Sequence, residues 1–407
     1  MNMRSLVVSS GVVLWFSLAA CVDTTPPAET GSGGSNGSGG AVVIGGSGGD
    51  GSAGSVFVGG SGGGGASGSG GSVVAGSGGS AVTDAGASTD SAIGNDGASD
   101  GGTGVDQPPT HPLNVTATKT RHTHNFRSKD ADPGVTFNDN TEIATVDPSS
   151  HTMVGKLILP FGGLGTDNGI TGPVGDFLVR RGYHVLGVAA FQNYNVVIGD
   201  PAFYGDARRS VFEGKNYTHK NEFATINLTP SDGVAMRVQK ALQYLQKLAP
   251  EEDWGYFLNA DGSVRWSDVA FTGQSHGASN APRFAKLVRA WRAVSFAGPR
   301  DNECNSLNTP SCEGVVTATW LTEPSATPMD RYYGVTGNQD AQHPQHLFAM
   351  YKANYVGQPV NVTTGAPYSN SHRIITDAGH AWFCDETTYK ALCNYLFDVP
   401  PENANGP

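Results

Sequence analysis

The chain contains short apolar segments separated by segments in which apolar residues recur at helical spacing. Continuous apolar runs are typical of buried strands, and alternating runs of half-buried strands. Together they predict strands at 114–119, 142–146, 156–160, 183–189, 269–272, 293–297, 331–336 and 372–376. Helical spacing predicts helices at 173–181, 231–248 (capped by Ser231-Asp232), 281–292 and 385–397, and a polar, irregular segment at 191–229. This alternation predicts an α/β fold, with a mainly parallel central sheet and helices on both faces.

Residues 21–110 lack the apolar side chains that a folded core needs. The segment consists mostly of Gly, Ser, Ala, Asp and Thr. Ordering such a chain costs more conformational entropy than its few apolar contacts return. We predict a disordered linker with a root-mean-square span of roughly 50 Å, followed by one folded catalytic domain at 111–407.

The first 20 residues have the layout of an export signal, because Arg4 precedes an apolar stretch that is too short for a stable membrane span. The stretch ends in Leu18-Ala19-Ala20-Cys21, which resembles a bacterial lipobox. That resemblance implies a lipid anchor at Cys21 in a bacterial cell envelope and, since Val22 follows, at the outer membrane or cell surface. The alternative is an ordinary signal peptide that is cleaved after Ala20.

The net charge of −11 lies mainly in the linker, where residues 22–110 include eight acidic residues and no base. The folded part is therefore near neutral. A nucleic-acid-binding protein would show a basic field, so the charge distribution argues against that class.

Four cysteines follow Cys21, and an even number in an exported chain predicts two disulfide bonds. We expect the local pairing, Cys304–Cys312 and Cys384–Cys393, because each pair brackets a short polar loop or a helix start. The alternative is a zinc site built from all four thiolates. Seven and eight intervening residues, however, are not the spacing of zinc knuckles.

Gly273-Gln274-Ser275-His276-Gly277 is the motif that indicates chemistry. The Gly-x-Ser-x-Gly pattern also occurs in the linker, so the flanks decide: a buried strand leads into Ser275 and a helix leaves it. A serine at such a sharp turn is forced outward, and its flanking positions must be small. The turn also lies at a helix N-terminus, which favours a developing negative charge. Ser275 is therefore the candidate nucleophile.

With this motif, residues 113–398 resemble the alpha/beta-hydrolase superfamily and its serine esterases and lipases. In that family the nucleophile, the acid and the histidine follow in this order along the chain. The resemblance implies Asp340 as the acid and His380 as the base, each just after a predicted strand. Asp301 is the alternative acid.

The other candidates near these positions have less prominent expected roles. His372 opens the last predicted strand and is the alternative base, although it should lie at the wrong end of the sheet. We expect Asp377 to form a turn, and His343 and His346 to lie at the surface or at a pocket rim. Trp382 is either a pocket wall or part of the core.

The resemblance also implies an oxyanion hole, formed by the backbone N–H after the nucleophile and by one from the loop after an earlier strand. These would be His276 and either Gly163 or Leu164. The loop has Pro160-Phe161 where the His-Gly-Gly-Gly version has its histidine, so the second donor stays open. A plain flexible turn is the alternative.

Two further clusters of polar residues permit two interpretations each. We expect an internal ion-pair group, or alternatively an arginine that contacts substrate, from Asp206, Arg208, Arg209 and Glu213. We expect solvated side chains, or alternatively a metal site, from His111, His122 and His124.

The expected function is that of an extracytoplasmic serine hydrolase, which cleaves carboxylic esters through an acyl-enzyme. The alternatives are a peptidase or amidase with the same triad, and a catalytically silent binding protein displayed on a hydrolase scaffold. No cofactor and no metal are implied. The expected partners are a small-molecule or polymer ester and a membrane, without nucleic acid, and the expected state is a monomer.

Overall fold

The computed structural model describes residues 108–118, 120–149, 152–195 and 199–405. All of them belong to one unit, Asp90–Pro407. The predictions for the export signal, for lipidation at Cys21 and for nearly all of the linker lie outside the described residues. Within the described ranges, no helix has both the length and the apolarity that crossing a membrane requires.

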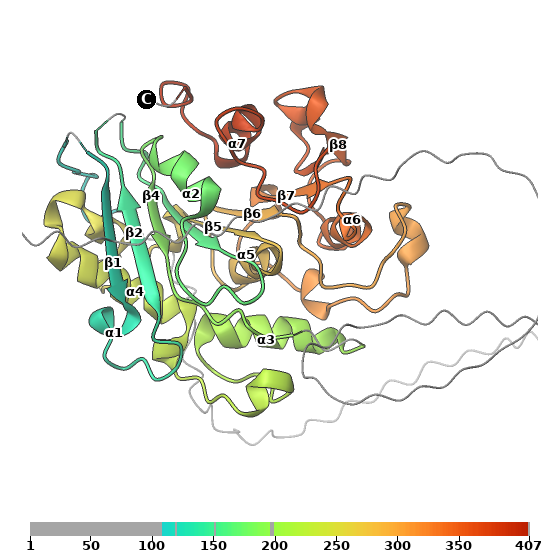
Figure 1. Ribbon diagram of the computed structural model, residues 1–407, viewed down its shortest axis with the longest axis horizontal. Helices are drawn as coiled ribbons and strands as arrows, with labels where there is room; N and C mark the ends of the chain where they lie inside the picture. The colour runs from blue at the N-terminus through green and yellow to red at the C-terminus, as the bar shows by residue number, and fades with distance from the viewer. Residues whose placement is uncertain (1–107, 119, 150–151, 196–198, 406–407) are drawn as a thin grey trace, which may run out of the picture. The chain divides into compact units, whose positions relative to one another are not determined.

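A nine-stranded sheet forms the centre of the described part of the chain (Figure 1). Its strands are β1 His122–Arg127, β2 Thr141–Val146, β3 Leu157–Phe161, β4 His184–Gly187, β5 Val269–Gln274, β6 Arg292–Phe296, β7 Tyr332–Gly337, β8 Val360–Asn361 and β9 Arg373–Thr376. They lie in the order β1-β2-β4-β3-β5-β6-β7-β9-β8. β2 is antiparallel to both of its neighbours, and all pairs from β4 to β8 are parallel. The predicted mainly parallel sheet is confirmed.

Helices cover both faces of this sheet, as predicted (Figure 1). They are α1 Ser128–Ala131, α2 Gly172–Val179, α3 Pro201–Glu213, α4 Val234–Leu248, α5 His276–Leu287, α6 His343–Lys352 and α7 Lys390–Phe397. Buried side chains of α2 and α7 belong to one apolar cluster. Those of α3, α4, α5 and α6 belong to a second, larger cluster. Apolar burial on each face therefore fixes the sheet between two helical layers.

The carboxyl ends of the parallel strands share one edge of the sheet. The loops after β3, β5, β6, β7 and β9 begin at this edge, and they carry Gly163, Ser275, Asp301, Asp340 and His380, in that order. In open α/β sheets, ligands bind outside the carboxyl ends of the strands. The topology thus collects the candidate residues at the edge where such a fold places its site.

The strand predicted at 114–119 is wrong. Residues 114–118 form no strand, because their backbone pairs with a loop: Thr116 N donates to Glu251 O at 2.8 Å and Asn114 N to an Asp253 carboxylate oxygen at 2.7 Å. The remaining predicted strands are confirmed to within a few residues. Two strands were not predicted: β1, which begins only at His122, and the short edge strand β8.

The irregular segment predicted at 191–229 is also wrong, because it contains α3. Asp200 caps this helix by accepting from Ala202 N and Phe203 N, Pro201 is its first residue, and Gly214 ends it in a left-handed conformation with φ 66°. These are ordinary start and stop signals, and the polar composition of the segment concealed them. Helix α6 was missed as well.

Three helix starts differ from the prediction. Helix α5 begins at His276 rather than 281, directly after Ser275, and ends at Leu287. The other two starts each involve an aspartate. Helix α4 begins at Val234, and the Asp232 carboxylate accepts instead from Thr136 N and Phe137 N at 2.8 and 2.7 Å. Helix α7 begins at Lys390 rather than 385, since Asp385 holds a turn by accepting from Thr387 N and Thr388 N. In both cases an aspartate serves a loop rather than the predicted helix.

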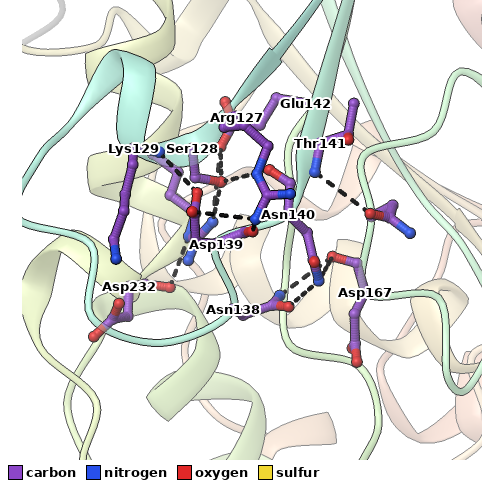
Figure 2. A network of polar contacts seen from close by, with 12 residues as sticks. Arg127, Ser128, Lys129, Asn138, Asp139, Asn140, Thr141, Glu142, Asp167 and Asp232 are labelled. Atoms are coloured by element: carbon purple, nitrogen blue, oxygen red, sulfur yellow. Dashed lines mark hydrogen bonds and ion pairs between the residues drawn. The ribbon is translucent and has the colours of Figure 1, made fainter.

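Polar contacts hold β1 and β2 to the rest of the fold around Ser128 and Glu142 (Figure 2). In the sheet order, β2 is three places from β5, the strand that leads into Ser275. Ser128 Oγ donates to Glu142 Oε1 at 2.9 Å, and the Arg237 guanidinium lies 3.8 Å from the same oxygen. Glu142 is buried, and burial raises its pKa to about 7 although Arg237 opposes the shift. We call Glu142 and Arg237 the corner pair. Ser128 is the hydroxyl partner of this pair.

Both predicted disulfides are confirmed. Cys304 is bonded to Cys312, and Cys384 to Cys393. The first closes the loop that packs on Phe348 of α6, and the second joins the segment after His380 to α7. Both bonds therefore brace loops that begin at the candidate edge of the sheet.

Candidate active site

Ser275 occupies a strained turn between β5 and α5. Its backbone angles are φ 59° and ψ −117°, a conformation that side-chain-bearing residues rarely adopt. The turn is held because Ser275 N donates to Phe296 O of the neighbouring strand at 3.0 Å. The residue is half-buried, so part of it faces solvent. Position 275 thus has the sharp strand-to-helix turn that the motif predicts, at a residue that is only half-buried.

The two glycines of the motif are required by close backbone contacts. A Cβ atom on Gly273 would lie 2.2 Å from the carbonyl oxygen of Gly277, and one on Gly277 would lie 2.3 Å from that of Phe161. Neither distance is compatible with a side chain. The prediction that both flanking positions must be small is confirmed, and the reason is the packing of α5 against the end of β3.

The loop after β3 runs beside the Ser275 hydroxyl. A Cβ atom on Gly163 would lie 3.9 Å from Ser275 Oγ. Gly277 N donates to Gly162 O at 2.9 Å, and Thr166 N donates to Gly163 O at 3.2 Å, which fixes the loop. Among the described residues, the backbone N–H groups of His276, Gly163 and Leu164 donate no recorded hydrogen bond. The N–H of His276, the residue after the serine, and that of Gly163, in the adjacent loop, therefore stay candidates for the predicted oxyanion hole.

Asp340 and His380 are joined by a hydrogen bond. His380 Nδ1 lies 2.6 Å from Asp340 Oδ2, and Asp340 Oδ1 accepts from Gln342 N at 2.9 Å. Burial alone would raise the pKa of Asp340, but the bonds from Gln342 N and His380 hold it below its ordinary value. The carboxylate thus stays ionised and accepts the Nδ1 proton of the ring. This leaves Nε2 as the ring nitrogen that can take a proton.

No hydrogen bond joins Ser275 Oγ to His380 among the residues that the structure describes. The two residues belong to the same edge of the sheet, since β5, β6, β7 and β9 are successive parallel neighbours. His380 is about one-third exposed. The structure thus joins the predicted acid, Asp340, to the predicted base, His380. Ser275 lies at the same edge of the sheet but, within the part of the chain that the structure describes, forms no hydrogen bond with the imidazole.

Asp301, the alternative acid, is occupied elsewhere. Its Oδ2 accepts from Arg208 Nε at 2.7 Å and from Trp320 Nε1 at 2.8 Å, and its Oδ1 accepts from Arg208 Nη2 at 2.6 Å. Burial would raise its pKa, yet the Arg208 charge holds that pKa below the ordinary value. Among the described residues, no imidazole is bonded to Asp301. The geometry therefore favours Asp340 as the partner of the base.

The other two candidates near the last strand, His372 and Asp377, lie where the sequence analysis expected them. His372 lies before β9, at the amino end of that strand, and its Nδ1 bonds Tyr332 O at 3.0 Å. Asp377 accepts from Asn338 Nδ2 at 2.8 Å and from Asn361 Nδ2 at 3.3 Å in the turn after β9. Neither residue is in contact with Ser275.

His343 and His346 are buried, so the prediction of surface or rim positions is wrong. Both rings place Nδ1 3.0 Å from Thr336 Oγ1, and His346 Nδ1 also lies 3.8 Å from Asp340 Oδ2. Burial lowers the pKa of His346 to about 3, so its ring is neutral. One sequence signal could have indicated these buried polar contacts near Asp340. The two histidines are spaced i, i+3 at the start of a helix directly after Asp340, so both lie on one helix face.

The predicted internal ion-pair group is wrong as a unit: only Arg209 and Glu213 pair within it, and both are partly exposed. Among the described residues, Asp206 forms no ion pair. Arg208 pairs with Asp301, and Arg209 Nε lies 2.8 Å from Glu213 Oε1. Arg208 is only 2% exposed, which excludes the alternative of a contact with substrate. Its Nη1 instead donates to His276 O at 3.2 Å and to Asn280 Oδ1 at 2.6 Å, both in the first turns of α5.

The histidines near the start of the domain are not solvated as predicted. His122 Nδ1 and His124 Nε2 lie 2.7 and 2.8 Å from one oxygen of the buried Glu252, and His111 Nε2 lies 2.7 Å from Asp253. The β-strand spacing of His122 and His124 puts both rings on one face of β1. Their role is to hold β1 on the loop at residues 251–254.

Trp382 packs against the core cluster that contains α2 and α7. Its ring lies 5.6 Å from the ring of Phe296, and a Cβ atom on Gly172 would lie 3.5 Å from it. The ring is half-buried, so Trp382 borders this core without being enclosed in it, and the pocket-wall interpretation stays a prediction.

No family model matches the chain, and no curated protein matches it. Solved structures with a similar chain course include an arylesterase, at 11% identity over 72% of this chain and 88% of that one, with a TM-score of 0.35. An esterase of Pyrococcus furiosus matches at 13% identity over 67% and 91%, with a TM-score of 0.33. A carboxyl esterase of the mycorrhizal fungus Tuber melanosporum matches at 12% identity over 72% and 85%, with a TM-score of 0.33. The chain's own sheet order and strand–serine–helix turn give it the alpha/beta-hydrolase fold that the sequence implied.

Proposed function

We propose that this protein hydrolyses carboxylic esters, with Ser275 as nucleophile, His380 as general base and Asp340 as the acid that orients the base. The observation that carries the proposal is the strained Ser275, with the Gly163 loop beside its hydroxyl, on the sheet edge that also holds the bonded Asp340–His380 pair. Strain of this kind persists only where the surrounding structure enforces it, and it is concentrated at functional sites.

The reaction follows from the roles of these groups. The Nδ1–H group of His380 donates a hydrogen bond to Asp340. The free Nε2 of the ring therefore accepts the proton of Ser275 Oγ as that oxygen attacks the ester carbonyl carbon. The carbonyl oxygen becomes an oxyanion, stabilised by the N–H of His276 and that of Gly163 or Leu164. Collapse breaks the ester C–O bond, and His380 protonates the departing alcohol. Water then hydrolyses the acyl-enzyme by the same proton path.

A kinetic comparison of serine variants tests this proposal. The full-length protein is assayed with 4-nitrophenyl acetate and the matching 4-nitroanilide, as wild type, as Ser275→Ala and as Ser263→Ala, a serine in a remote surface turn. We expect ester hydrolysis to fall at least about 1000-fold in Ser275→Ala and to be unchanged in Ser263→Ala. Equal ester turnover by Ser275→Ala would refute the assignment, and faster turnover of the anilide would make the protein an amidase.

We also propose that the protein is exported and anchored by a lipid at Cys21. Two disulfides in the folded domain support an oxidising compartment, and the Leu-Ala-Ala-Cys spelling supports lipidation. Mass analysis of the mature N-terminal peptide, from cells that express the full chain, tests the proposal. We expect an acylated Cys21; an unmodified N-terminus at Cys21 or at another residue contradicts it.

A further inference from the structure

A buried ion pair lies directly beneath the start of α5. We call Arg208 of α3 and Asp301 of the loop after β6 the elbow pair. The two residues are 2% and 3% exposed, and they form two parallel hydrogen bonds, Nε–Oδ2 at 2.7 Å and Nη2–Oδ1 at 2.6 Å. Bidentate geometry of this kind is the strongest form of arginine–carboxylate contact.

The elbow pair is oriented with respect to the helix that follows Ser275. The third guanidinium nitrogen, Arg208 Nη1, donates to the backbone carbonyl of His276 and to Asn280 Oδ1. The Asp301 carboxylate instead contacts Trp320 Nε1, and among the described residues it has no recorded bond to α5. The guanidinium thus lies between the helix and the carboxylate. The pair is a fixed dipole whose positive end contacts the first turn of α5.

The pKa of the His276 side chain indicates the sign of the electrostatic potential at the first turn of α5. Burial, and after it the Arg208 charge, lower the pKa of the ring to about 3, and Asp301 opposes them with a smaller effect. The ring packs edge-on against Tyr194, with centroids 4.5 Å apart. The cation therefore acts on this turn more strongly than the anion does. Because the surroundings are buried, solvent screens the dipole poorly.

We propose that Arg208 is a positioning residue for the oxyanion hole, and that the elbow pair stabilises the negative charge that develops beside the His276 N–H during the reaction. The inference rests on the proposed function, since it concerns the same site. Arg208 fixes the first turn of α5 through the His276 carbonyl, and the positive end of the dipole adds to the potential of the helix N-terminus. The bound ester is neutral at this position, so the effect belongs to the transition state and should appear in kcat rather than in KM.

Two variants remove one end or both ends of the elbow pair. In Asp301→Asn the negative end of the dipole is removed while the Arg208 charge remains. In the double variant Arg208→Met/Asp301→Leu both charges are removed, a replacement that buried ion pairs often tolerate. The matched control is Arg237→Met/Glu142→Leu, a buried arginine–carboxylate pair outside the site. Each variant is made in the full chain and checked for folding by circular dichroism.

The proposal predicts opposite signs for the two variants. We expect kcat for 4-nitrophenyl acetate to fall about tenfold in the double variant, less than the loss of a direct oxyanion donor, with KM unchanged. We expect kcat in Asp301→Asn to equal or exceed that of wild type, and kcat in the control to be unchanged. A folded double variant with wild-type kcat, or a folded Asp301→Asn with lowered kcat, overturns the proposal.

The test stays informative if one variant does not fold or if the esterase assignment itself fails. If the double variant is unfolded, the sign of the change in Asp301→Asn decides. If Ser275→Ala is as active as wild type, the proposed function fails. If activity depends on Ser275 but the elbow variants do not change kcat as stated, only the role of the elbow pair fails.

Discussion

The elbow pair and the corner pair are alike in composition and burial but differ in geometry. Arg208 and Asp301 share two bonds of 2.6 and 2.7 Å, whereas the Arg237 guanidinium lies 3.8 Å from Glu142. The pKa of Asp301 lies below its ordinary value, and that of Glu142 is raised to about 7. Contact geometry, and not burial alone, thus decides whether a buried carboxylate keeps its charge. The elbow pair, which stays charged near Ser275, can therefore influence the proposed reaction. The corner pair, whose Glu142 titrates near neutrality, makes the free energy of unfolding depend on pH.

The largest expected effect distinguishes Asp340 from the carboxylate of the elbow pair. In Asp340→Asn the amide no longer fixes the Nδ1–H tautomer of His380, and kcat should fall about 10⁴-fold. Asp301→Asn should retain kcat, because Asp301 contacts no imidazole. Steady-state kinetics on the ester measures both. If the two losses were exchanged between the variants, Asp301 would be the acid of the triad.

The next effect concerns the stability of the corner pair. The pKa of Glu142 is raised by folding, so its ionisation costs stability; the cost is absent below about pH 4.5 and complete above about pH 7. Glu142→Gln should therefore stabilise the protein by up to about 3 kcal/mol at pH 8 and by nearly nothing at pH 4.

Urea unfolding at the two pH values measures this difference, and the elbow pair supplies the contrast. Asp301→Asn should be destabilising at pH 8, because the lowered pKa of Asp301 contributes stability that is present above its unfolded pKa and lost in acid. A Glu142→Gln gain that is the same at both pH values would show that Glu142 keeps an ordinary pKa in the folded protein.

A smaller effect is expected from filling the close contact at Gly277. The Cβ atom in Gly277→Ala would lie 2.3 Å from Phe161 O, and relieving this overlap should cost about 1–3 kcal/mol. Because relieving the overlap displaces the start of α5 and with it the His276 N–H, kcat should fall as well. For Gly379→Ala, where nothing lies within 4 Å of the added atom, we expect stability close to that of wild type. Equal stabilities of the two variants, measured by urea unfolding, would contradict the packing of this turn.

The smallest effect is expected from an exposed ion pair on the same helix as Arg208. Arg209 and Glu213 are spaced i, i+4, and their side chains are 41% and 31% exposed. Solvent screens such a pair, so Glu213→Gln should cost only about 0.3–0.5 kcal/mol. Thermal unfolding at low and high salt measures it. A loss of several kcal/mol would place this pair with the buried ones.

The parts of the fold that the sequence predicted depend on local patterns. Apolar runs identified the buried strands, and two small residues around Ser275 identified the turn that their packing requires. The cysteine spacing identified both disulfides. In each case the signal lies in residues that are close in sequence, even where the contact behind it is distant, as between Gly277 and Phe161 O.

The parts that were missed depend on contacts between distant residues. Arg208 and Asp301 are 93 positions apart, and no local pattern announces their pairing. His343 and His346 are buried because Thr336, on the preceding strand, takes both rings as partners. Helix α3 did carry a local signal, Asp200-Pro201 at its start and Gly214 after its end, but its polar composition outweighed that signal.

The most direct test of the central claim is the mass of the protein after reaction with a fluorophosphonate, which phosphonylates an activated serine hydroxyl. The account predicts one adduct per full-length chain, mapped by peptide sequencing to Ser275, with none in His380→Ala. An unlabelled folded protein, an adduct on another serine, or equal labelling without the imidazole would contradict it.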